Sequence, residues 1–312
     1  SLHIIEKIAF EKKIKDWPGF GIALQAYGKR SFDVINWLND HLKKRAGMHL
    51  RLVKGAYWDY EIKHAQVSGY EGYPVFSKKS LTDIAYLACA KEILKNKNIF
   101  PKFATHNAHT ISSIHHLGEG CEYEFQRLYG MGELLYKSAS EVFDLKDKPS
   151  VYSPIGDYKD LLPYLVRRLL ENGANSSFIN RLLDAETDPK WLSENPYKRI
   201  KSETKDIPLP KNIYTSRPNS SGIDITERQN LEVLKENLKV YETKIVNAVS
   251  LYEGRKDSKK TIEEVFSISS GHHIGNVVFD EQEQLKKCLE KNSSNEWSNT
   301  QTEQRSKILN KI

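Results

Sequence analysis

The chain has 312 residues, 39% of them hydrophobic and 28% charged, which is enough for a sizeable core and about two structural units. No apolar run approaches the ~20 residues that a membrane-spanning helix needs, and no charged-then-apolar leader pattern predicts export. The net charge of +6 is mild and its basic residues alternate with acidic ones, so we do not expect nucleic acid as a partner. Cys89, Cys121 and Cys288 are far apart, which predicts free thiols in a cytoplasmic protein.

Strand-like and helix-like patterns alternate over the first 173 residues. Helical spacing of apolar residues predicts a helix over 1–15, which Trp17-Pro18-Gly19 ends, and a loop is expected through Tyr73-Pro74. We predict strands over 21–27, 49–53, 102–109, 123–132 and 151–156, and helices over 32–45, 84–94, 111–117, 134–143 and 158–172. The last helix is expected to bury Leu161, Leu162, Leu165, Val166, Leu169 and Leu170.

About five such repeats are typical of parallel βα units. Polar or glycine-rich residues gather where each predicted strand ends, at Gln25, Lys54, His106, Met131 and Tyr152. This asymmetry favours a (β/α)8 TIM-barrel-type fold, in which the chemistry lies on the loops that follow the strands. Because only five of its units are visible, and because the chain starts at Ser1 inside a helical pattern, we expect residues 1–182 to be the C-terminal part of a truncated barrel.

The sequence changes character after residue 182. Charge and proline rise over 183–222, which we interpret as a linker. A helix is then predicted over 231–251, a hairpin over 266–280 that turns near Gly271, and a polar helix over 281–312. Residues 223–312 therefore form a partial α/β segment with too little core to stand alone.

The predicted strand around Arg51 is the centre of the pattern. It ends in Lys54 and Gly55, followed by the aromatic rings of Tyr57 and Trp58. A cation, a glycine that allows close backbone approach and two ring faces can grip a flat, phosphate-bearing cofactor. The alternative is a core strand with an extended surface lysine and packed aromatic side chains.

Two further groups of residues are candidates for chemistry. Arg167 and Arg168 lie in the helix after the fifth strand, and Glu171 can pair with Arg167 at helical spacing. Such a guanidinium group suits a substrate carboxylate, although a surface ion pair explains the pattern equally. His106, at a strand end, could contact a cofactor or relay a proton, or be structural. His109 has no acidic partner at helical spacing, so no metal site is predicted.

Phosphate-binding and nucleophile motifs are absent from the sequence. No GxGxxG follows a predicted strand, no GxxxxGK[ST] is present and no GxSxG occurs. A Rossmann or P-loop nucleotide site is therefore unsupported within these residues.

Long motifs of the chain closely resemble the proline dehydrogenase domain of the proline utilization A family. That bifunctional bacterial family joins proline dehydrogenase to pyrroline-5-carboxylate (glutamate semialdehyde) dehydrogenase. The resemblance covers about residues 1–200 and is carried by residues 50–59, 103–110, 128–133 and 164–175. It continues weakly into residues 207–222, which resemble the linker, and residues 223–312 resemble the start of the aldehyde dehydrogenase half.

The resemblance implies a distorted (β/α)8 barrel that holds FAD. It places Arg51 by the flavin N5 atom and Gln25 at the edge of the flavin ring. The residues that would line or contact the cofactor are Val53, Lys54, Gly55, Ala56, Trp58, Thr105, His106, Asn107, Gln126 and Leu128. Tyr57, Leu128 and Tyr152 would wall the proline ring. Arg167 and Arg168 would clamp its carboxylate, and Glu171 would brace them or reach the ribityl chain.

The reaction implied by the resemblance is oxidation of L-proline to 1-pyrroline-5-carboxylate by hydride transfer to flavin N5, the first step of proline catabolism to glutamate. Catalysis would rest on Arg51, Lys54, Tyr57, Tyr152, Arg167 and Arg168. A membrane quinone would accept the electrons, which allows peripheral contact with the inner membrane face. NAD belongs only to the remainder of the aldehyde dehydrogenase half.

Two alternatives stay open at this point. The family places a functional aspartate and a lysine in early barrel strands, and that region precedes Ser1. An open five-stranded sheet would also expose apolar edges. The chain would then be an inactive fragment that acts as a scaffold, or a part that needs a complementing chain or a homo-oligomer.

Overall fold

A computed structural model describes residues 2–41, 43–145, 148–173, 194–200, 207–250, 261–292 and 296–311. The chain divides into two compact units, Ser1–Ile223 and Asp224–Ile312, and each is described by itself.

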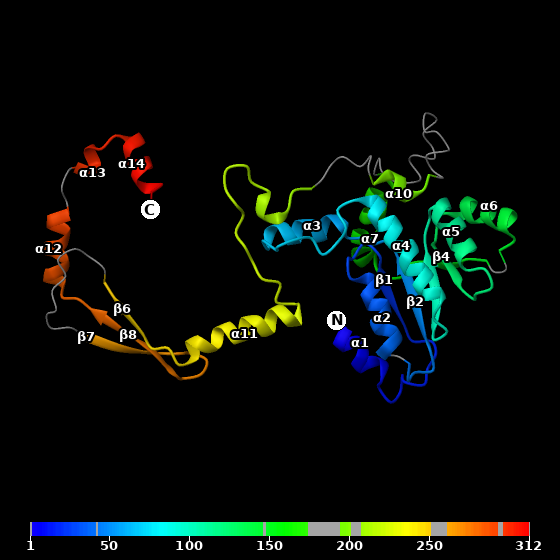
Figure 1. Ribbon diagram of the computed structural model, residues 1–312, viewed down its shortest axis with the longest axis horizontal. Coiled ribbons are helices and arrows are strands. Elements are labelled where there is room, and N and C mark those ends of the chain that lie inside the picture. Colours follow the sequence, from blue (N-terminus) through cyan, green and yellow to red (C-terminus); the bar gives the residue numbers. More distant parts are fainter. Residues whose placement is uncertain are drawn as a thin grey trace. The chain divides into compact units, whose positions relative to one another are not determined.

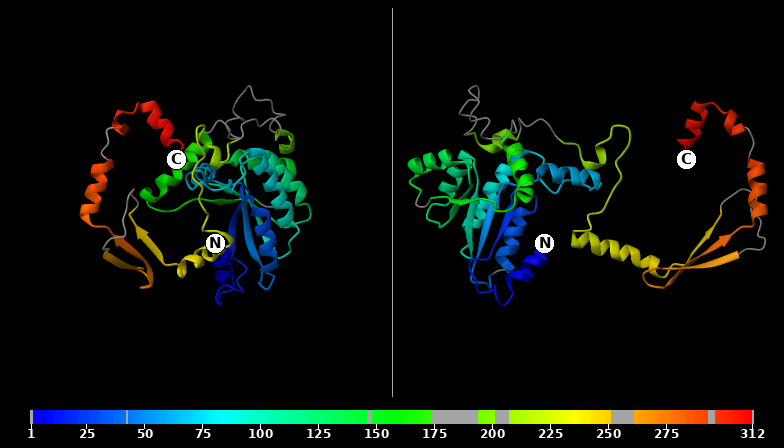
Figure 2. Two further views of the ribbon diagram at one scale, coloured as in Figure 1. Left: turned by 60° about the vertical axis from the view of Figure 1, so that its left-hand side comes forward. Right: turned by 180° about the vertical axis from the view of Figure 1, so that it is seen from behind.

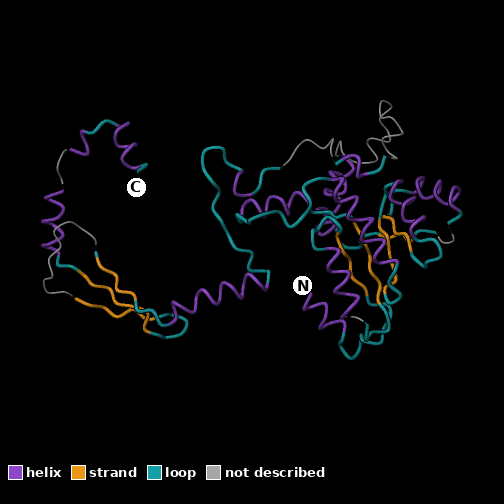
Figure 3. The backbone as a smooth tube through the Cα atoms, in the orientation of Figure 1, coloured by secondary structure: helices purple, strands orange, loops and turns teal. Residues whose placement is uncertain are grey.

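The first unit is an α/β fold built on a parallel sheet, as the alternating pattern predicts. Its strands are β1 (Gly21–Gln25), β2 (Met48–Val53), β3 (Ile99–Ala104), β4 (Glu124–Leu128) and β5 (Ser150–Tyr152). They pair in sequence order, each parallel to the next. Figure 3 draws them as neighbouring orange segments. The helices are α1 (Leu2–Ala9), α2 (Ser31–His41), α3 (Trp58–Val67), α4 (Lys79–Leu94), α5 (Ala108–Leu117), α6 (Glu133–Phe143), α7 (Tyr158–Gly173) and α10 (Pro196–Arg199).

The core lies between one face of this sheet and helices α2, α4, α5 and α6 (Figure 1). Burial alternates along β2, where Met48, Leu50 and Leu52 point into the core and the residues between them are only partly covered. Strand β3 repeats the pattern, with Phe103 fully buried. Because neighbouring side chains of a strand point to opposite faces, the second face of the sheet is left for polar residues.

Several helices differ from the sequence-based prediction, since α2 ends at His41 rather than Arg45 and α4 begins at Lys79 rather than Ile84. The first helix was expected over 1–15 but ends at Ala9, where Arg45 Nη1 donates a hydrogen bond to the Ala9 carbonyl at 2.5 Å. The same guanidinium bonds the Trp17 carbonyl at 2.7 Å, so it fixes the chain reversal that ends the helix. The loop expected after β2 contains α3, whose sparse apolar residues, such as Ile62 and Ala65, gave a weak helical pattern.

Helix α7 was expected to bury its apolar side chains, and this prediction was wrong. Leu162, Leu165, Val166 and Leu169 are between 44% and 71% exposed. The helix follows the edge strand β5, which is itself exposed, and no described element covers its apolar face. The side chain of Leu170 lies outside the described residues.

Residues 207–222, which we interpret as part of a linker, pack on the first unit. They include the 3-10 helix η1 (Pro210–Asn212), and Ile207 joins a second apolar cluster around Tyr27, Ile62 and Tyr73. The Tyr73 hydroxyl donates to the Pro208 carbonyl at 2.7 Å, and the Asn219 side chain donates to the Gln66 carbonyl at 2.8 Å. We call residues 207–222 the strap.

The second unit has a small mixed sheet and four helices in its described part (Figure 2). Its elements are α11 (Arg228–Glu242), β6 (Val246–Val249), β7 (Thr261–Phe266), β8 (His273–Phe279), α12 (Gln282–Asn292), α13 (Glu296–Asn299) and α14 (Thr302–Leu309). Strands β7 and β8 form the expected hairpin, and Gly271 in its turn has a φ of 68°.

Two predictions for this unit were wrong. The helix expected over 231–251 ends at Glu242, because Val246 to Val249 pair with β8 as a parallel strand that favours β-branched residues. The single helix expected over 281–312 is three helices, of which α13 and α14 are separated near Thr300.

Candidate functional site

The carboxyl ends of the five parallel strands define the candidate site. The register places Gln25 of β1 beside Val53 of β2, and Ala104 of β3 beside Gln126 of β4. Leu128 of β4 pairs with Tyr152 of β5 at the same edge. Because the strands run in parallel, the loops that follow them start from one edge of the sheet. The predicted site residues therefore meet at this edge.

A polar layer covers the sheet face opposite the core. Arg51, Lys102 and Glu124 occupy matching positions on β2, β3 and β4. Lys102 Nζ lies 2.9 Å from Glu124 Oε2, and the Gln126 side chain donates to Glu124 Oε1 at 2.8 Å. Burial raises the pKa of Glu124, but hydrogen bonds from Gln126, Lys102 and Ser150 outweigh it and leave the pKa below its usual range.

Two buried polar atoms of Arg51 and Gln126 have no hydrogen-bond partner among the described residues. They are Nε of Arg51, a donor, and Oε1 of Gln126, an acceptor. Buried polar atoms are nearly always paired in folded proteins, so this unpaired donor and acceptor are available to a ligand that offers both kinds of group. A flavin ring, with acceptors and donors along its edge, satisfies that requirement.

The loop after β2 has a close-packed backbone. Gly55 has a φ of +133°, and a Cβ atom built there would lie 2.5 Å from Cγ of the Tyr27 ring. Only glycine fits both the conformation and the space. The Gln25 side-chain oxygen accepts from the Ala56 amide at 3.4 Å, which ties the loop to the end of β1.

Lys54 and Trp58 of the same loop have fixed partners. Lys54 Nζ lies 2.5 Å from Asp83 Oδ1 on α4. The Trp58 indole donates to the Phe76 carbonyl at 2.8 Å. These two interactions, of the Lys54 ammonium group and the Trp58 indole, therefore stabilise the loop after β2.

The Thr105-His106-Asn107 segment connects β3 to α5. Asn107 is the N-cap of α5, and its side-chain oxygen accepts from the Thr110 amide at 2.9 Å. The Tyr136 hydroxyl donates to the Thr105 carbonyl at 2.9 Å. His106 Nε2 accepts from the Leu128 amide at 3.2 Å, which links the ends of β3 and β4.

His106 is held in its neutral form. Burial lowers its pKa, and the positive charges of Arg168 and Arg127 lower it further. An imidazole that accepts a backbone hydrogen bond at Nε2 must carry its proton on Nδ1. His106 can therefore donate from Nδ1 and bears no charge of its own at neutral pH.

The two arginines of α7 reach the same edge of the sheet. The Arg167 guanidinium lies 5.1 Å from the Tyr57 ring centroid, and Arg168 lies close enough to His106 to lower its pKa. Across the site, the Arg51 guanidinium lies 5.4 Å from the Tyr152 ring centroid. This edge thus carries two guanidinium–phenol contacts, Arg51 with Tyr152 and Arg167 with Tyr57, and the charge of a third guanidinium group, that of Arg168, acts on His106. The Glu171 side chain, predicted to pair with Arg167, lies outside the described residues.

Sequence reasoning missed three residues near Lys54. Asp83 on α4 is 8% exposed at its side chain, and its Oδ2 atom lies 3.9 Å from Arg199 Nη2 of α10. His109, assigned no role beyond exclusion from a metal site, has its pKa lowered by burial first and then by Arg199 and Lys54. The sequence signal for such a site was the aspartate Asp83, which stands directly before an apolar run that includes Ile84 and Tyr86.

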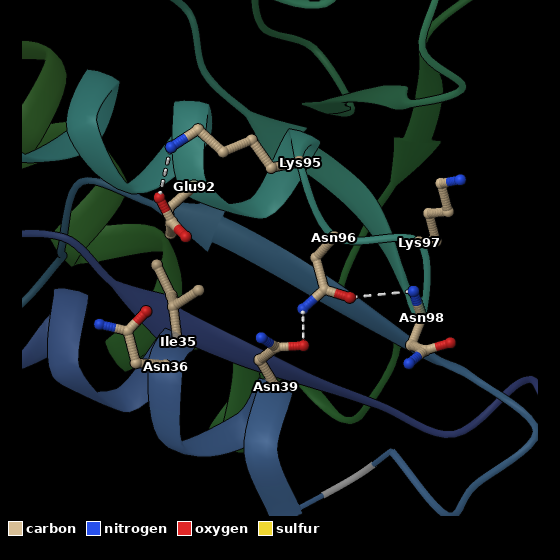
Figure 4. A pocket seen from close by; sticks show the side chains of 8 residues that line it. All are labelled: Ile35, Asn36, Asn39, Glu92, Lys95, Asn96, Lys97 and Asn98. Atoms are coloured by element: carbon tan, nitrogen blue, oxygen red, sulfur yellow. Dashed lines mark hydrogen bonds and ion pairs between the residues drawn. The ribbon is translucent and has the colours of Figure 1, made fainter.

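The opposite end of the sheet carries a shallow polar groove of about 200 Å³ between α2 and the end of α4. Figure 4 shows the Asn96 side chain between Asn39 and Asn98, to which it makes hydrogen bonds of 2.7 and 2.9 Å. The amide groups that line the groove are hydrogen-bonded to one another, so we interpret the groove as a structural feature rather than a binding site. Across the described ranges, no group of three or more His, Cys, Asp or Glu side chains could hold a metal ion.

Comparison with known proteins agrees with the geometry. A family model described as proline dehydrogenase matches residues 1–181. The chain belongs to the proline dehydrogenase family. Among curated relatives of this family, bifunctional protein PutA of Salmonella typhimurium is 45% identical over 258 residues, which are 76% of this chain and 20% of that protein. Proline dehydrogenase 1 of Caenorhabditis elegans is 32% identical over 202 residues, 60% of this chain and 32% of that protein.

Solved proline utilization A structures superpose well on this chain. A proline utilization A structure with proline bound in remote sites has a TM-score of 0.71 at 42% identity, and covers 79% of this chain and 26% of that one. The enzyme from Bdellovibrio bacteriovorus inactivated by N-propargylglycine has a TM-score of 0.75 at 28% identity, and covers 97% of this chain and 32% of that one. The chain spans about a fifth of the length of the curated PutA relatives that it matches.

Proposed function

We propose that the chain carries the proline-oxidising site of a PutA-type enzyme, with L-proline as substrate, FAD as cofactor and 1-pyrroline-5-carboxylate as product. The observation that supports this most directly is the pair of guanidinium–phenol contacts, Arg51 with Tyr152 and Arg167 with Tyr57, on elements at or after the carboxyl ends of the strands. Guanidinium groups bind a carboxylate, and aromatic rings enclose a small apolar ring. Those are the two halves of a proline molecule.

The polar layer fits the flavin. The unpaired Nε of Arg51 and Oε1 of Gln126 offer a donor and an acceptor from two strands. Residues that would line the ring or its chain are Gln25, Val53, Lys54, Gly55, Ala56, Trp58, Thr105, His106, Asn107, Leu128 and Glu171. When bound, the flavin supplies the acceptor for a hydride from proline C5, at its N5 atom.

The protein's own contribution is binding, orientation and charge. Arg167 and Arg168 hold the carboxylate of proline, while Tyr57, Leu128 and Tyr152 fix the ring so that C5 faces the cofactor. Arg51 and Lys54 place positive charge where negative charge develops. Neutral His106 keeps the β3 and β4 ends together without adding a further cation to the site.

The test is the visible spectrum of the purified chain, after incubation with FAD, before and after L-proline is added without oxygen. Flavin absorption that bleaches with L-proline, and not with D-proline, supports the proposal. Bound flavin that L-proline does not reduce would contradict the proposed reaction.

A second candidate is a chain that is inactive by itself and needs a complementing chain or a second copy. The exposed apolar face of α7, with Leu162, Leu165 and Leu169, favours it, because such a face is normally covered. Absence of flavin from the isolated chain, with flavin binding restored by co-expression of the preceding part of a PutA-type protein, would support this candidate.

Three further assignments belong to the same proposal. We infer that a membrane quinone accepts the electrons from a cytoplasmic protein that contacts the inner face of the membrane peripherally. In the described part of the chain, no helix is both long and apolar enough to cross a bilayer. We also propose that residues 223–312 are the start of an aldehyde-dehydrogenase-like half, whose remainder would bind NAD. Quinone-dependent reoxidation of the reduced chain in anionic vesicles would test the first assignment.

A further inference from the structure

Lys54 is the first residue after strand β2, at the candidate site, and its ammonium group forms an ion pair with Asp83. The Nζ to Oδ1 distance is 2.5 Å, and the Lys54 side chain is 26% exposed whereas that of Asp83 is only 8% exposed. A carboxylate this deeply covered needs a cationic partner, because an unpaired buried charge is strongly unfavourable. The pair is therefore a fixed feature of the site.

Asp83 also has a second cationic neighbour. Its other oxygen, Oδ2, lies 3.9 Å from Nη2 of Arg199, the last residue of α10. Helix α10 begins at a capping residue, Asn195, whose side chain accepts from the Tyr197 amide at 2.9 Å, and its Pro196 is buried. The two carboxylate oxygens of Asp83 thus face two cations, Lys54 from within the family-matched residues 1–181 and Arg199 from beyond them.

We propose that Asp83 is a positioning residue that fixes the Lys54 ammonium at the mouth of the sheet, and that Arg199 fixes Asp83 in turn. The site then extends beyond the family-matched residues and includes α10. The consequence for cofactor binding rests on the proposed function, whereas the consequence for Lys54 itself does not. Burial lowers the pKa of His109, and the charges of Arg199 and Lys54 lower it further against the opposing effect of Asp83, which agrees with a cluster that carries more positive than negative charge.

The first test measures the reactivity of the Lys54 amine and needs no cofactor. The full chain is treated briefly with an amine-acylating reagent, and modification of Lys54 is measured by mass spectrometry. Asp83→Asn should raise the modification rate about threefold, because Lys54 is released from its partner. An unchanged rate at Lys54 in Asp83→Asn would overturn the proposal. Lys63, an exposed lysine on α3, provides an internal reference in every sample.

The role of Arg199 is read in the same assay. Arg199→Gln should change Lys54 modification when Asp83 is present and have no further effect in Asp83→Asn, because Arg199 acts through the carboxylate. Arg199→Lys should restore wild-type behaviour, since it keeps the charge. Lys198→Gln removes one charge from the exposed side of the same helix and should have no effect. An equal response to Arg199→Gln in both backgrounds would remove Arg199 from the proposal.

Cofactor affinity separates this inference from the proposed function. Asp83→Asn should weaken FAD binding about tenfold when Lys54 is present and less than about twofold in Lys54→Met. In the Lys54→Met background the ammonium group that Asp83 would position is absent. Equal losses in both backgrounds would show a general structural role for Asp83. If the wild-type chain binds no FAD, the proposed function fails, while the Lys54 modification result still decides the positioning role. Circular dichroism confirms that each variant is folded.

Discussion

Gly69 and Gly222 cross with their backbones in direct contact. The Gly222 amide donates to the Gly69 carbonyl at 2.9 Å, and a Cβ atom on Gly69 would collide with the Ser220 carbonyl. Gly69 also has a left-handed φ of +63°. These two glycines lie 153 positions apart and hold the strap against the end of α3, the helix that begins at Trp58.

Gly69→Ala should detach the strap. The added methyl group collides with the strap backbone, so the crossing must open, and we expect ~2 kcal/mol of destabilisation. Hydrogen exchange in residues 207–222 should accelerate while exchange in β2 and β3 stays slow. The matched control is Gly120→Ala, which has a similar φ of +76° but no neighbour within 4 Å. Equal acceleration in both variants would show that conformational strain alone, rather than the contact, causes the effect.

Gly55→Ala should impair the candidate site. Its φ of +133° is unfavourable for alanine, and the methyl group would press on the Tyr27 ring, so the loop that carries Lys54 must move. We expect a loss of ~2 kcal/mol in the free energy of unfolding and loss of FAD binding. Gly72→Ala is the control, because nothing lies within 4 Å of its added methyl group. Unfolding in denaturant and flavin titration give the two values, and normal flavin affinity in Gly55→Ala would contradict the expectation.

Acidification should destabilise the first unit between about pH 7 and pH 5. Burial is the first cause that lowers the pKa of His49, His106 and His109 in the folded chain. Below the ordinary histidine pKa of 6.5, the unfolded chain binds more protons than the folded one. The stability of the fold therefore decreases as the pH is lowered. The lowered pKa of Glu124 acts only below its ordinary value of 4.5 and does not affect this window.

His106→Gln should make this loss of stability shallower, because one of the three histidines no longer titrates. Thermal unfolding at a series of pH values measures how steeply stability depends on pH. This slope is not affected by a pH-independent loss of stability from the missing hydrogen bond to Leu128. His116→Gln, at an exposed position on α5, should keep the wild-type slope. A wild-type slope in His106→Gln would rule out the proposed contribution.

Arg167→Gln should weaken the binding of L-proline more than it slows the reaction. The variant loses a charge-assisted contact with the carboxylate and the 5.1 Å stacking on Tyr57, so we expect the KM to rise about tenfold. Lys159→Gln removes the same charge near the start of the same helix and should leave the KM unchanged. A KM that rises equally in both variants would indicate a general loss of positive charge rather than a carboxylate clamp.

Local sequence patterns predicted the parallel βα order well because their causes are local. Alternating burial along β2 and β3 follows from side chains that point to opposite faces of a strand, and the polar strand ends follow from the edge that parallel strands share. Helix α3 was missed because its apolar positions are few, and β6 was missed because a strand is stabilised by partners that lie elsewhere in the chain.

The sequence by itself determined the α/β class, the five parallel strands and the edge at which Arg51, His106 and Tyr152 gather. Only the tertiary structure decided that Asp83 and Arg199 join Lys54, and that Gly222 crosses Gly69. The physical reason is distance along the chain. Periodicity and capping act over a few residues, whereas an ion pair between distant helices depends on how the whole sheet and its helices pack.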